Sequence, residues 1–514
     1  MLVLATAVPA VMSVKNSQIN KTAPSTPQTC IAGDWGETQK ILASDGDEED
    51  GFGTYGDLDG DTLIIGATLD DQNGVESGSA YVFTRIGTTW TQQAKLTASD
   101  GEAGEWFASF IDLDGDTALI GAMYDDDNGG HSGSAYVFTR SGTTWSQQAK
   151  LLPSDGIEDA QFGISVALDG DTALIGANRD DDNGIRSGSA YIFTRSGTTW
   201  TQQAKLIASD GAEEERFGIG VDLDGDTAMI GSETPDNGDY SGSVYVFTGS
   251  GATWTETQKL LASDGAATDW FGFDIDLDGD TALFSACQDD DMGLNSGSAY
   301  VFVYNGTAWI EQQKLTASDG AAGDHFSQYA VALDGDTALI GAWYDDDQGA
   351  NSGSAFVFTR SGTTWTQQQK LLASDGAAGD CFSTGLLDGD TAVLTAYQDD
   401  NENGNDSGSA YIFTKSGADL IFSIVGGFGV DLKITNNGTT VANDIPFQIH
   451  IEGGILGVIN KTENGTIDIP AEDTILVGIG MFLGLGPISI TAKVADIEQT
   501  ATGFQFIIFS MVKK

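Results

Sequence analysis

A repeat of about 55 residues constrains the fold of this 514-residue chain more than any other feature. The string Leu-Asp-Gly-Asp-Thr occurs seven times, with successive copies 54 to 56 residues apart. Two further markers, Ser-Gly-Ser and Ser-Asp-Gly, occur with the same period. The first marker begins at Leu58, Leu113, Leu168, Leu223, Leu277, Leu333 and Leu387. Three markers in one register indicate seven consecutive copies of one structural unit.

Each copy predicts four β-strands. In the second copy, residues 107–113 and 117–122 flank Asp114-Gly115, which is the composition of a two-residue hairpin loop. A polar loop then leads to a third strand at 134–140 and a fourth at 145–151. Apolar side chains on both faces of the middle strands indicate sheets that are stacked between neighbours.

The phase of the repeat predicts a closed ring instead of an open stack. A Trp marks each predicted fourth strand, but the last copy ends at residues 411–414 without one. The missing strand occurs at the other end of the repeats, in residues 35–42. Pairing of the two ends closes a ring and removes exposed sheet edges. The prediction is an all-β, seven-bladed β-propeller at residues 31–417 with N-terminal strand closure.

Phe-Gly and Gly-Ala pairs recur in the copies, as in Phe52-Gly53 and Gly66-Ala67. With these pairs, residues of about 35 to 415 resemble the FG-GAP repeat of integrin α-subunit heads and prokaryotic surface proteins. The resemblance implies adhesion or ligand binding. The chain lacks the Pro of GAP and the family's D-x-D-x-D-G calcium loop, where only Asp-Gly stands. That connection is too short to surround a calcium ion, so the integrin calcium sites are not carried over.

Residues 418–514 lack the repeat. Short apolar stretches separated by turns predict about seven strands and therefore an immunoglobulin-like β-sandwich. The segments ADLIFS, VDLKITNNGTTVAND and GPISITAKV resemble a CARDB-type adhesion module. No apolar run reaches the roughly 18 residues of a spanning helix, so no membrane span is expected.

Residues 1–30 predict a signal-like and disordered N-terminus. The apolar run at 2–12 and the small residues around Ala10 resemble a signal-peptide core, although no Lys or Arg precedes it. Several N-x-Ser/Thr sequons are also compatible with export. The expected location is secreted or cell-surface.

Charge narrows the classes of partner. The chain has 76 Asp and Glu against 22 Lys and Arg, a formal net charge of -54, and a 40% apolar content that suits a folded core. Such a field repels nucleic acid and anionic lipid. We therefore expect cations to associate with this chain.

Carboxylates gather in the predicted loops between second and third strands. One interpretation is solvated turns, and the other is calcium binding, because adjacent carboxylates repel unless solvated, protonated or bridged by a cation. The candidate calcium ligands are Asp125, Asp127, Asp180, Asp182, Asp289, Asp291, Asp345, Asp347, Asp399, Asn401 and Asn403. The last three match D-x-[DN]-x-[DN]-G, but Ala410 stands where the motif has Glu.

Four aromatic residues are candidate ligand contacts. Trp106, Trp270 and Trp343 lie outside the fourth-strand pattern, and with Tyr397 they are predicted beside the acidic loops. Exposed Trp beside Asp suits sugar binding, and a packed Trp is the alternative.

Catalytic motifs are not evident. The three His occupy unrelated positions, and no Ser or Cys stands in a nucleophile motif. The expectation is a non-catalytic adhesion or ligand-recognition protein with a protein or glycan partner at the Asp-rich face. The alternatives are a structural component of a cell envelope or extracellular layer, with self-assembly, and an exported polysaccharide-active enzyme.

Overall fold

The computed structural model describes residues 28–29, 34–415, 420–426, 430–436, 442–453, 459–469, 473–479, 486–494 and 497–505. The chain divides into two compact units, Trp35–Thr414 and the residues on either side of it. Within the described ranges all 36 regular elements are strands, and no helix there is long and apolar enough to cross a membrane. The apolar run at residues 2–12 lies outside the described residues.

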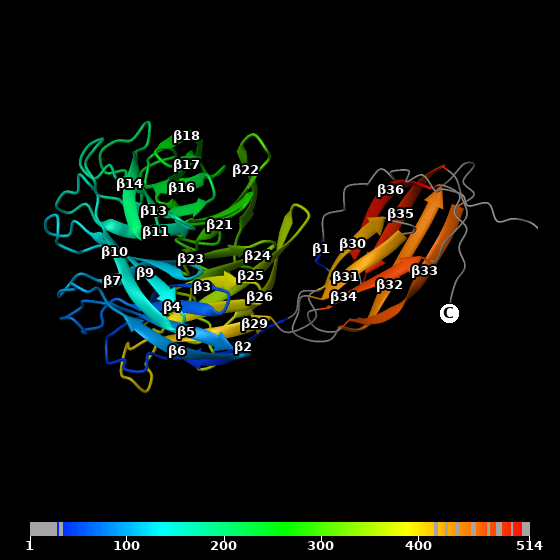
Figure 1. Cartoon of the computed structure of the whole chain (residues 1–514), viewed down its shortest axis with the longest axis horizontal. Coiled ribbons are helices and arrows are strands. Elements are labelled where there is room, and N and C mark those ends of the chain that lie inside the picture. Colours follow the sequence, from blue (N-terminus) through cyan, green and yellow to red (C-terminus); the bar gives the residue numbers. More distant parts are fainter. Residues whose placement is uncertain are drawn as a thin grey trace, which may run out of the picture. The chain divides into compact units, whose positions relative to one another are not determined.

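Seven four-stranded antiparallel sheets form the first unit, which confirms the seven-bladed propeller (Figure 1). Blade 1 contains β3 (Phe52–Asp59), β4 (Thr62–Ala67), β5 (Ser79–Ile86) and β6 (Thr89–Leu96). Blade 2 contains β7 (Phe107–Asp114), β8 (Thr117–Ala122), β9 (Ser134–Ser141) and β10 (Thr144–Leu151). Blade 3 contains β11 (Phe162–Asp169), β12 (Thr172–Ala177), β13 (Ser189–Ser196) and β14 (Thr199–Leu206). Blade 4 contains β15 (Val221–Asp224), β16 (Thr227–Ser232), β17 (Ser243–Ser250) and β18 (Thr253–Leu260).

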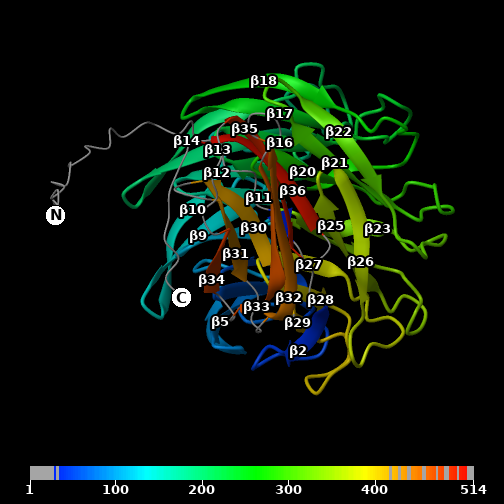
Figure 2. The same cartoon turned by 90° about the vertical axis from the view of Figure 1, so that its right-hand side faces the viewer.

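The remaining blades repeat this order. Blade 5 contains β19 (Phe271–Asp278), β20 (Thr281–Ala286), β21 (Ser298–Tyr304) and β22 (Trp309–Leu315). Blade 6 contains β23 (Phe326–Asp334), β24 (Thr337–Ala342), β25 (Ser354–Ser361) and β26 (Thr364–Leu371). Blade 7 has the sheet order β2-β29-β28-β27, with β2 (Trp35–Ile41), β29 (Ser409–Lys415), β28 (Thr391–Ala396) and β27 (Thr384–Asp388). The first strands contact one another from blade to blade, including β27 with β3, so they surround a central channel (Figures 1 and 2).

The first strand of most blades contains a bulge that aims side chains at this channel. In blade 2, Phe107 pairs with Ala122 and Ile111 pairs with Ile120, so four steps along β7 match only two along β8. The same register shift occurs in blades 1, 3 and 5, and in blade 6 five steps along the first strand match two along the second. A bulge leaves extra residues outside the ladder and re-aims their side chains. The residues just after the Phe therefore project toward the channel.

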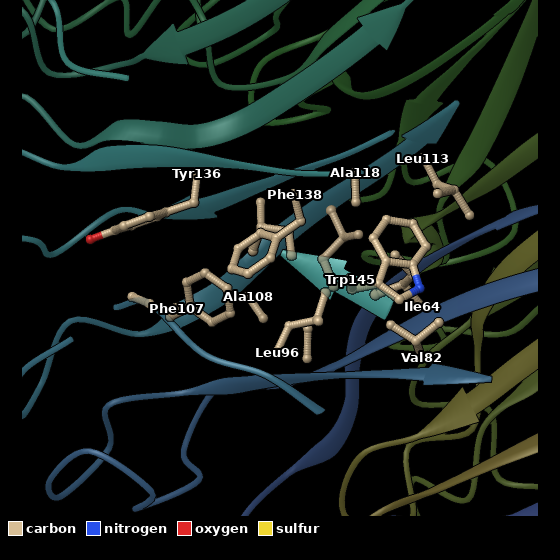
Figure 3. Packing of buried hydrophobic residues seen from close by; sticks show 14 of the residues in the cluster. Ile64, Val82, Leu96, Phe107, Ala108, Leu113, Ala118, Tyr136, Phe138 and Trp145 are labelled. Carbon is tan, nitrogen blue, oxygen red and sulfur yellow. The ribbon is translucent and has the colours of Figure 1, made fainter. Parts of the chain in front are cut away.

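Apolar side chains pack between neighbouring blades, as Figure 3 shows for the first two. Ile64 and Val82 of blade 1 lie in one buried cluster with Phe107 and Phe138 of blade 2. Close approach of the backbones requires glycine beside this core. Gly78, the Gly of Ser-Gly-Ser, has φ +83°, and a Cβ there would overlap the backbone oxygen of Phe107. The recurring Phe and Gly are thus the contacts that join one blade to the next.

The second unit contains two four-stranded sheets. One has the order β1-β30-β31-β34, and the other has the order β33-β32-β35-β36. Their strands are β1 (Gln28–Thr29), β30 (Leu420–Gly426), β31 (Val430–Asn436), β34 (Asp473–Ile479), β33 (Ile459–Ile469), β32 (Ala442–Gly453), β35 (Gly486–Val494) and β36 (Ile497–Gln505). The end of the segment expected to be disordered thus forms a strand, because Gln28 and Thr29 pair with β30. The immunoglobulin-like, CARDB-type assignment stays a prediction.

Candidate functional site

The acidic loops converge on lysines. In blade 2, Lys150 Nζ lies 3.0 Å from Asp100, 2.7 Å from Asp125 and 2.7 Å from Asp127. Asp125 is buried and also accepts a hydrogen bond of 2.9 Å from the Tyr136 hydroxyl. Burial alone would lower the pKa of Lys150, but the hydrogen bonds to the carboxylates outweigh burial and raise this pKa. The ammonium group therefore offsets part of the negative charge of these loops.

Every blade repeats this lysine-centred cluster. The triads are Lys205 with Asp155, Asp180 and Asp182; Lys314 with Asp264, Asp289 and Asp291; and Lys370 with Asp319, Asp345 and Asp347. The pairs are Lys40 with Asp375 and Asp399, Lys95 with Asp45 and Asp70, and Lys259 with Asp210 and Asp236. A calcium ion would have to compete with these ammonium groups. In the described part of the chain, no group of three or more His, Cys, Asp or Glu is arranged to hold a metal ion.

The seventh loop was the best match to a calcium motif. Here Asn401 donates its amide to the backbone oxygen of Gly408 at 2.7 Å, and Asn403 donates its amide to the backbone oxygen of Ala43 at 2.9 Å. The Asn401 side-chain oxygen accepts the Asn403 backbone N–H at 2.8 Å. The two amides thus support the loop, and Asp399 belongs to a lysine-centred cluster. Calcium binding stays a prediction at this loop.

Replacement of the central lysine tests the role of these clusters. Lys150→Met should lower the free energy of unfolding by about 2–3 kcal/mol, because Asp125 is left buried without its cation while its two half-exposed neighbours are screened by water. Urea denaturation measures the loss, and Lys150→Arg is the matched control that keeps the charge. Calcium chloride should restore part of the lost stability, whereas sodium chloride at equal ionic strength should not. Equal stability of Lys150→Met and wild type would contradict this role.

A cavity of about 450 Å³ occupies the channel at the centre of the blades. In each blade, the third residue after the recurring Phe of the inter-blade contact lines this cavity. We call these seven residues the channel ring. They are Tyr55, Phe110, Ser165, Gly220, Asp274, Tyr329 and Gly385. The volume suits a small ligand.

Aromatic side chains form one wall of the cavity. The Tyr55 ring lies 4.1 Å from Phe110 and 6.0 Å from Tyr329, measured between ring centroids. The Tyr329 ring lies 4.8 Å from Phe273 and 5.4 Å from Trp343. These rings come from blades 1, 2, 5 and 6 and form a continuous apolar surface.

Carboxylates lie deeper in the cavity, at the residue before Leu-Asp-Gly-Asp-Thr. These are Asp57, Asp112, Asp222 and Asp276. Asp57 accepts the backbone N–H of Leu58 and that of Leu113 in the next blade, each at 2.7 Å, so it bridges two blades. Burial, together with the Asp57 charge, raises the pKa of Asp112 well above its ordinary value. Burial also raises the pKa of Asp222 to about 7.

The four aromatic candidates from the sequence gather at the loop-side mouth of the channel. Trp106 and Trp343 line the cavity itself. Trp270 stacks on Phe273 with ring centroids 5.3 Å apart, and Tyr397 lies 5.4 Å from Trp343. All four are half-buried. The structure thus connects Trp270, Trp343 and Tyr397 through ring contacts and places Trp106 at the same cavity, whereas it places the predicted calcium ligands in separate clusters in different blades.

Comparison with protein families decides the relationship. The family model described as FG-GAP repeat matches residues 35–83, 90–138, 145–193, 200–247, 254–302, 309–358 and 365–413. These segments make up more than half of the chain. The chain belongs to the FG-GAP repeat family.

Other comparisons add less to the FG-GAP assignment. No curated protein matches the sequence significantly. A hypothetical selenium-binding protein from Sulfolobus tokodaii is 10% identical with a TM-score of 0.40, covering 63% of this chain and 80% of its own. An exo-beta-1,3-galactanase from Phanerochaete chrysosporium is 10% identical with a TM-score of 0.33, covering 91% and 99%. These scores are too low to bear on function.

The FG-GAP copies differ most where they border the mouth of the channel. The residue before the Phe is Gly51, Trp106, Gln161, Arg216, Trp270, His325 and Cys381 in blades 1 to 7, and φ is between +50° and +64° at all seven. The residue after the Gly-Ala position is Thr68, Met123, Asn178, Glu233, Cys287, Trp343 and Tyr397. We call these fourteen residues the mouth residues. Seven of the mouth residues are half-buried and differ in chemistry, and the other seven are buried. The half-buried ones are Trp106, Met123, Arg216, Trp270, His325, Trp343 and Tyr397. The left-handed φ of the residue before the Phe strains any side chain other than Gly at that position.

Sequence reasoning missed the channel ring and the deep carboxylates. The available signal was the variation between copies in the few residues separating Phe from Leu-Asp-Gly-Asp-Thr, as in Gly-Thr-Tyr-Gly-Asp after Phe52 and Gly-Phe-Asp-Ile-Asp after Phe271. These segments read as ordinary strands, and only the bulge turns them toward the channel.

Proposed function

We propose that this FG-GAP propeller is a non-catalytic ligand-recognition or adhesion protein, secreted or displayed at the cell surface, whose partner engages the channel mouth. The observation that carries the proposal is the diversity of the seven half-buried mouth residues on otherwise near-identical blades. Packing alone would favour the same side chain at equivalent positions of a repeat. A specific partner instead requires different chemistry at each point of contact.

The face of the propeller opposite the channel mouth supports the same proposal, because its Asp-Gly hairpins do not vary. There the seven Asp-Gly hairpins have one sequence and one conformation, with φ of the Gly between +55° and +58°. Such turns leave few side chains with which to build a specific site. Half-buried Trp and Tyr beside Asp are suited to a glycan or a protein loop, because they combine apolar area with hydrogen-bonding groups.

The location and the presentation of the propeller are part of the proposal. The signal-like N-terminus and the sequons support export. The two sheets of the second unit support a sandwich of the immunoglobulin or CARDB type that would present the propeller. Self-assembly into an extracellular layer is the alternative role.

Substitution of the mouth aromatics tests the proposal. A glycan array and a pull-down from cell-surface extract identify the partner, and its affinity is then measured for Trp106→Ala, Trp270→Ala, Trp343→Ala and Tyr397→Ala. We expect a loss of about tenfold or more for Trp343→Ala, as for an aromatic contact at the centre of an interface. The matched control on the opposite face is Asp114→Asn, which should keep full affinity. A partner that maps to the Asp-Gly hairpins, or wholly to the second unit, would overturn the proposal.

A further inference from the structure

The charges bordering the central cavity are all negative. Five carboxylates line it, and none of its lining residues, which all belong to the described propeller, is Lys, Arg or His. The acidic loop clusters of the described propeller each have a lysine at their centre, so the cavity differs from them. Enclosed carboxylates without a counter-charge are costly to ionise. A positively charged ligand would remove that cost.

Asp274 is the carboxylate placed for such a ligand. The deep carboxylates join neighbouring blades through short hydrogen bonds from backbone N–H groups, as Asp222 does with Leu277 at 2.6 Å. Asp274 instead accepts longer bonds, 3.1 Å from the Val331 N–H and 3.2 Å from the Ile275 N–H. It belongs to the channel ring, in the position that Tyr329 occupies one blade later. Asp274 is thus the least committed of the five to holding the blades together.

Aromatic rings line the same cavity as Asp274. Its negative charge, after burial, contributes to raising the pKa of Tyr55 and of Tyr329, so both hydroxyls are within its electrostatic reach. Phe273 precedes it in the chain and contacts Tyr329. Ser165 and Gly220 fill the channel-ring positions of blades 3 and 4, and their small size leaves the volume of the cavity open. A carboxylate framed by aromatic faces is a favourable environment for an ammonium group.

Two polar groups at the cavity lack a partner. Ser109 is 2% exposed, and its hydroxyl makes no hydrogen bond to any described residue. The buried Trp343 Nε1 also has no acceptor among the described residues. Both residues line the cavity. Because buried polar groups are nearly always satisfied in folded proteins, these two are available to hydrogen-bond a polar ligand group or water in the cavity.

We propose that the central cavity binds a small organic cation, with its ammonium group between Asp274 and the rings of Tyr55 and Tyr329. A polar group of the same ligand would reach Ser109 and Trp343. The net charge of -54 raises the local concentration of such cations. A calcium ion fits less well, because it needs six or more oxygen ligands and the described residues form no such group. This site deepens the proposed recognition function by naming a class of ligand. Its biological role rests on that proposed function, whereas the binding of the cation itself does not.

Calorimetric titration of the full chain with choline tests the site directly. The comparison compound is 3,3-dimethylbutan-1-ol, which has the same shape and hydroxyl group but no charge. Choline should bind at millimolar or lower concentration, and the neutral compound should bind at least about tenfold more weakly, since the ion pair and the cation–π contacts are lost. Fluorescence of Trp343 and Trp106 should change on binding, because both line the cavity.

Variants locate the cation. Asp274→Asn should weaken choline binding at least about tenfold, and Tyr55→Leu should weaken it several-fold while the apolar volume is retained. The matched control is Asp280→Asn, which removes the same charge from an exposed hairpin of the same blade. Thermal unfolding of each variant shows whether it is folded. Equal losses of choline affinity for Asp274→Asn and Asp280→Asn would show that the effect arises from the overall negative charge of the protein, and would overturn the assignment of the cation to Asp274.

The remaining outcomes separate this inference from the proposed function. Absence of choline binding, equal affinity for the neutral compound, or binding of calcium alone would overturn the organic-cation site. Partner capture that still depends on Trp343 and Tyr397 would then leave the proposed function standing. If choline binds but the partner maps to the second unit, the organic-cation site stands and the proposed function fails.

Discussion

Deletion of residues 1–43 is expected to abolish the cooperative unfolding transition of the propeller. The deletion removes β2, which is the outer strand of blade 7 and pairs with β29. It also removes the buried side chains of Trp35 and Ile41, each 4% exposed, and the Lys40 ammonium that pairs with Asp375 and Asp399. Loss of a buried Trp alone costs about 3–5 kcal/mol, and a domain has only about 5–15 kcal/mol in total. The truncated ring should therefore be open or only partly folded.

Urea denaturation followed by Trp fluorescence measures this effect. The matched control is deletion of residues 1–27, which keeps both β1 and β2 and should leave the midpoint unchanged. Addition of a peptide covering residues 28–43 to the longer deletion should restore part of the transition, because the strand can pair in trans. If the 1–43 deletion unfolded with the same midpoint and slope as the full chain, β2 would not be needed to hold the ring closed.

Substitution of Asp274 by Asn is expected to stabilise the propeller at alkaline pH. Burial raises the pKa of Asp274 from its ordinary value of 3.8 to about 7 in the folded protein. Below pH 4 the carboxyl is protonated in both the folded and unfolded chains, so Asp274→Asn should change little. As the pH rises toward 7 the unfolded chain releases the proton more easily, and the wild type loses stability. The difference between 3.8 and about 7, at about 1.4 kcal/mol per pH unit, predicts a gain of about 4 kcal/mol for the variant above pH 7.

Denaturation at pH 4 and pH 8 checks the sign. Asp280→Asn is again the control, because Asp280 is exposed on a hairpin of the same blade. Removing its charge should change stability by only a few tenths of a kcal/mol at either pH. A gain at pH 4 equal to that at pH 8 would show that the effect of Asp274→Asn arises from packing, and a loss at pH 8 would show that its carboxylate is stabilising.

The sequence predicts the blades because each strand is repeated seven times with the same turn chemistry. Asp114-Gly115 and its equivalents define the first hairpin of every blade, and the predicted strands of the second copy agree with β7 to β10. The lysine-centred clusters were not predicted. Lys150 lies on the fourth strand, 25 residues after Asp125, and nothing in local spacing connects them. Only the pairing of β10 with β9, which sets Lys150 opposite Tyr136, brings its ammonium group to the carboxylates of the loops.

The central cavity could not be predicted from the sequence for a different reason. Strand prediction assumes alternation of side chains, and the bulge after Phe107 breaks that alternation. The segment is also one residue longer in blade 6, between Phe326 and Leu333, and one residue shorter in blade 7, between Phe382 and Leu387. The residue before Leu-Asp-Gly-Asp-Thr is therefore the fifth after the Phe in blades 1 to 5, the sixth in blade 6 and the fourth in blade 7, so the deep positions do not share one count from the Phe. The aromatic candidates at the mouth were accessible to prediction because they follow the fixed Phe and Gly-Ala markers.

The boundaries of the FG-GAP repeats do not coincide with the boundaries of the sheets. This offset bears on how such a ring can evolve. Each repeat begins at the Trp of one blade's fourth strand and ends in the third strand of the next blade, as residues 90–138 run from β6 to β9. An in-frame duplication of one repeat therefore inserts a whole blade while both chain ends of the propeller keep their sequences. The terminal strands that join in the last blade would be the same in a ring of six, seven or eight. Recombination between copies can thus change the circumference of the ring, and with it the width of the channel, without creating an unpaired strand.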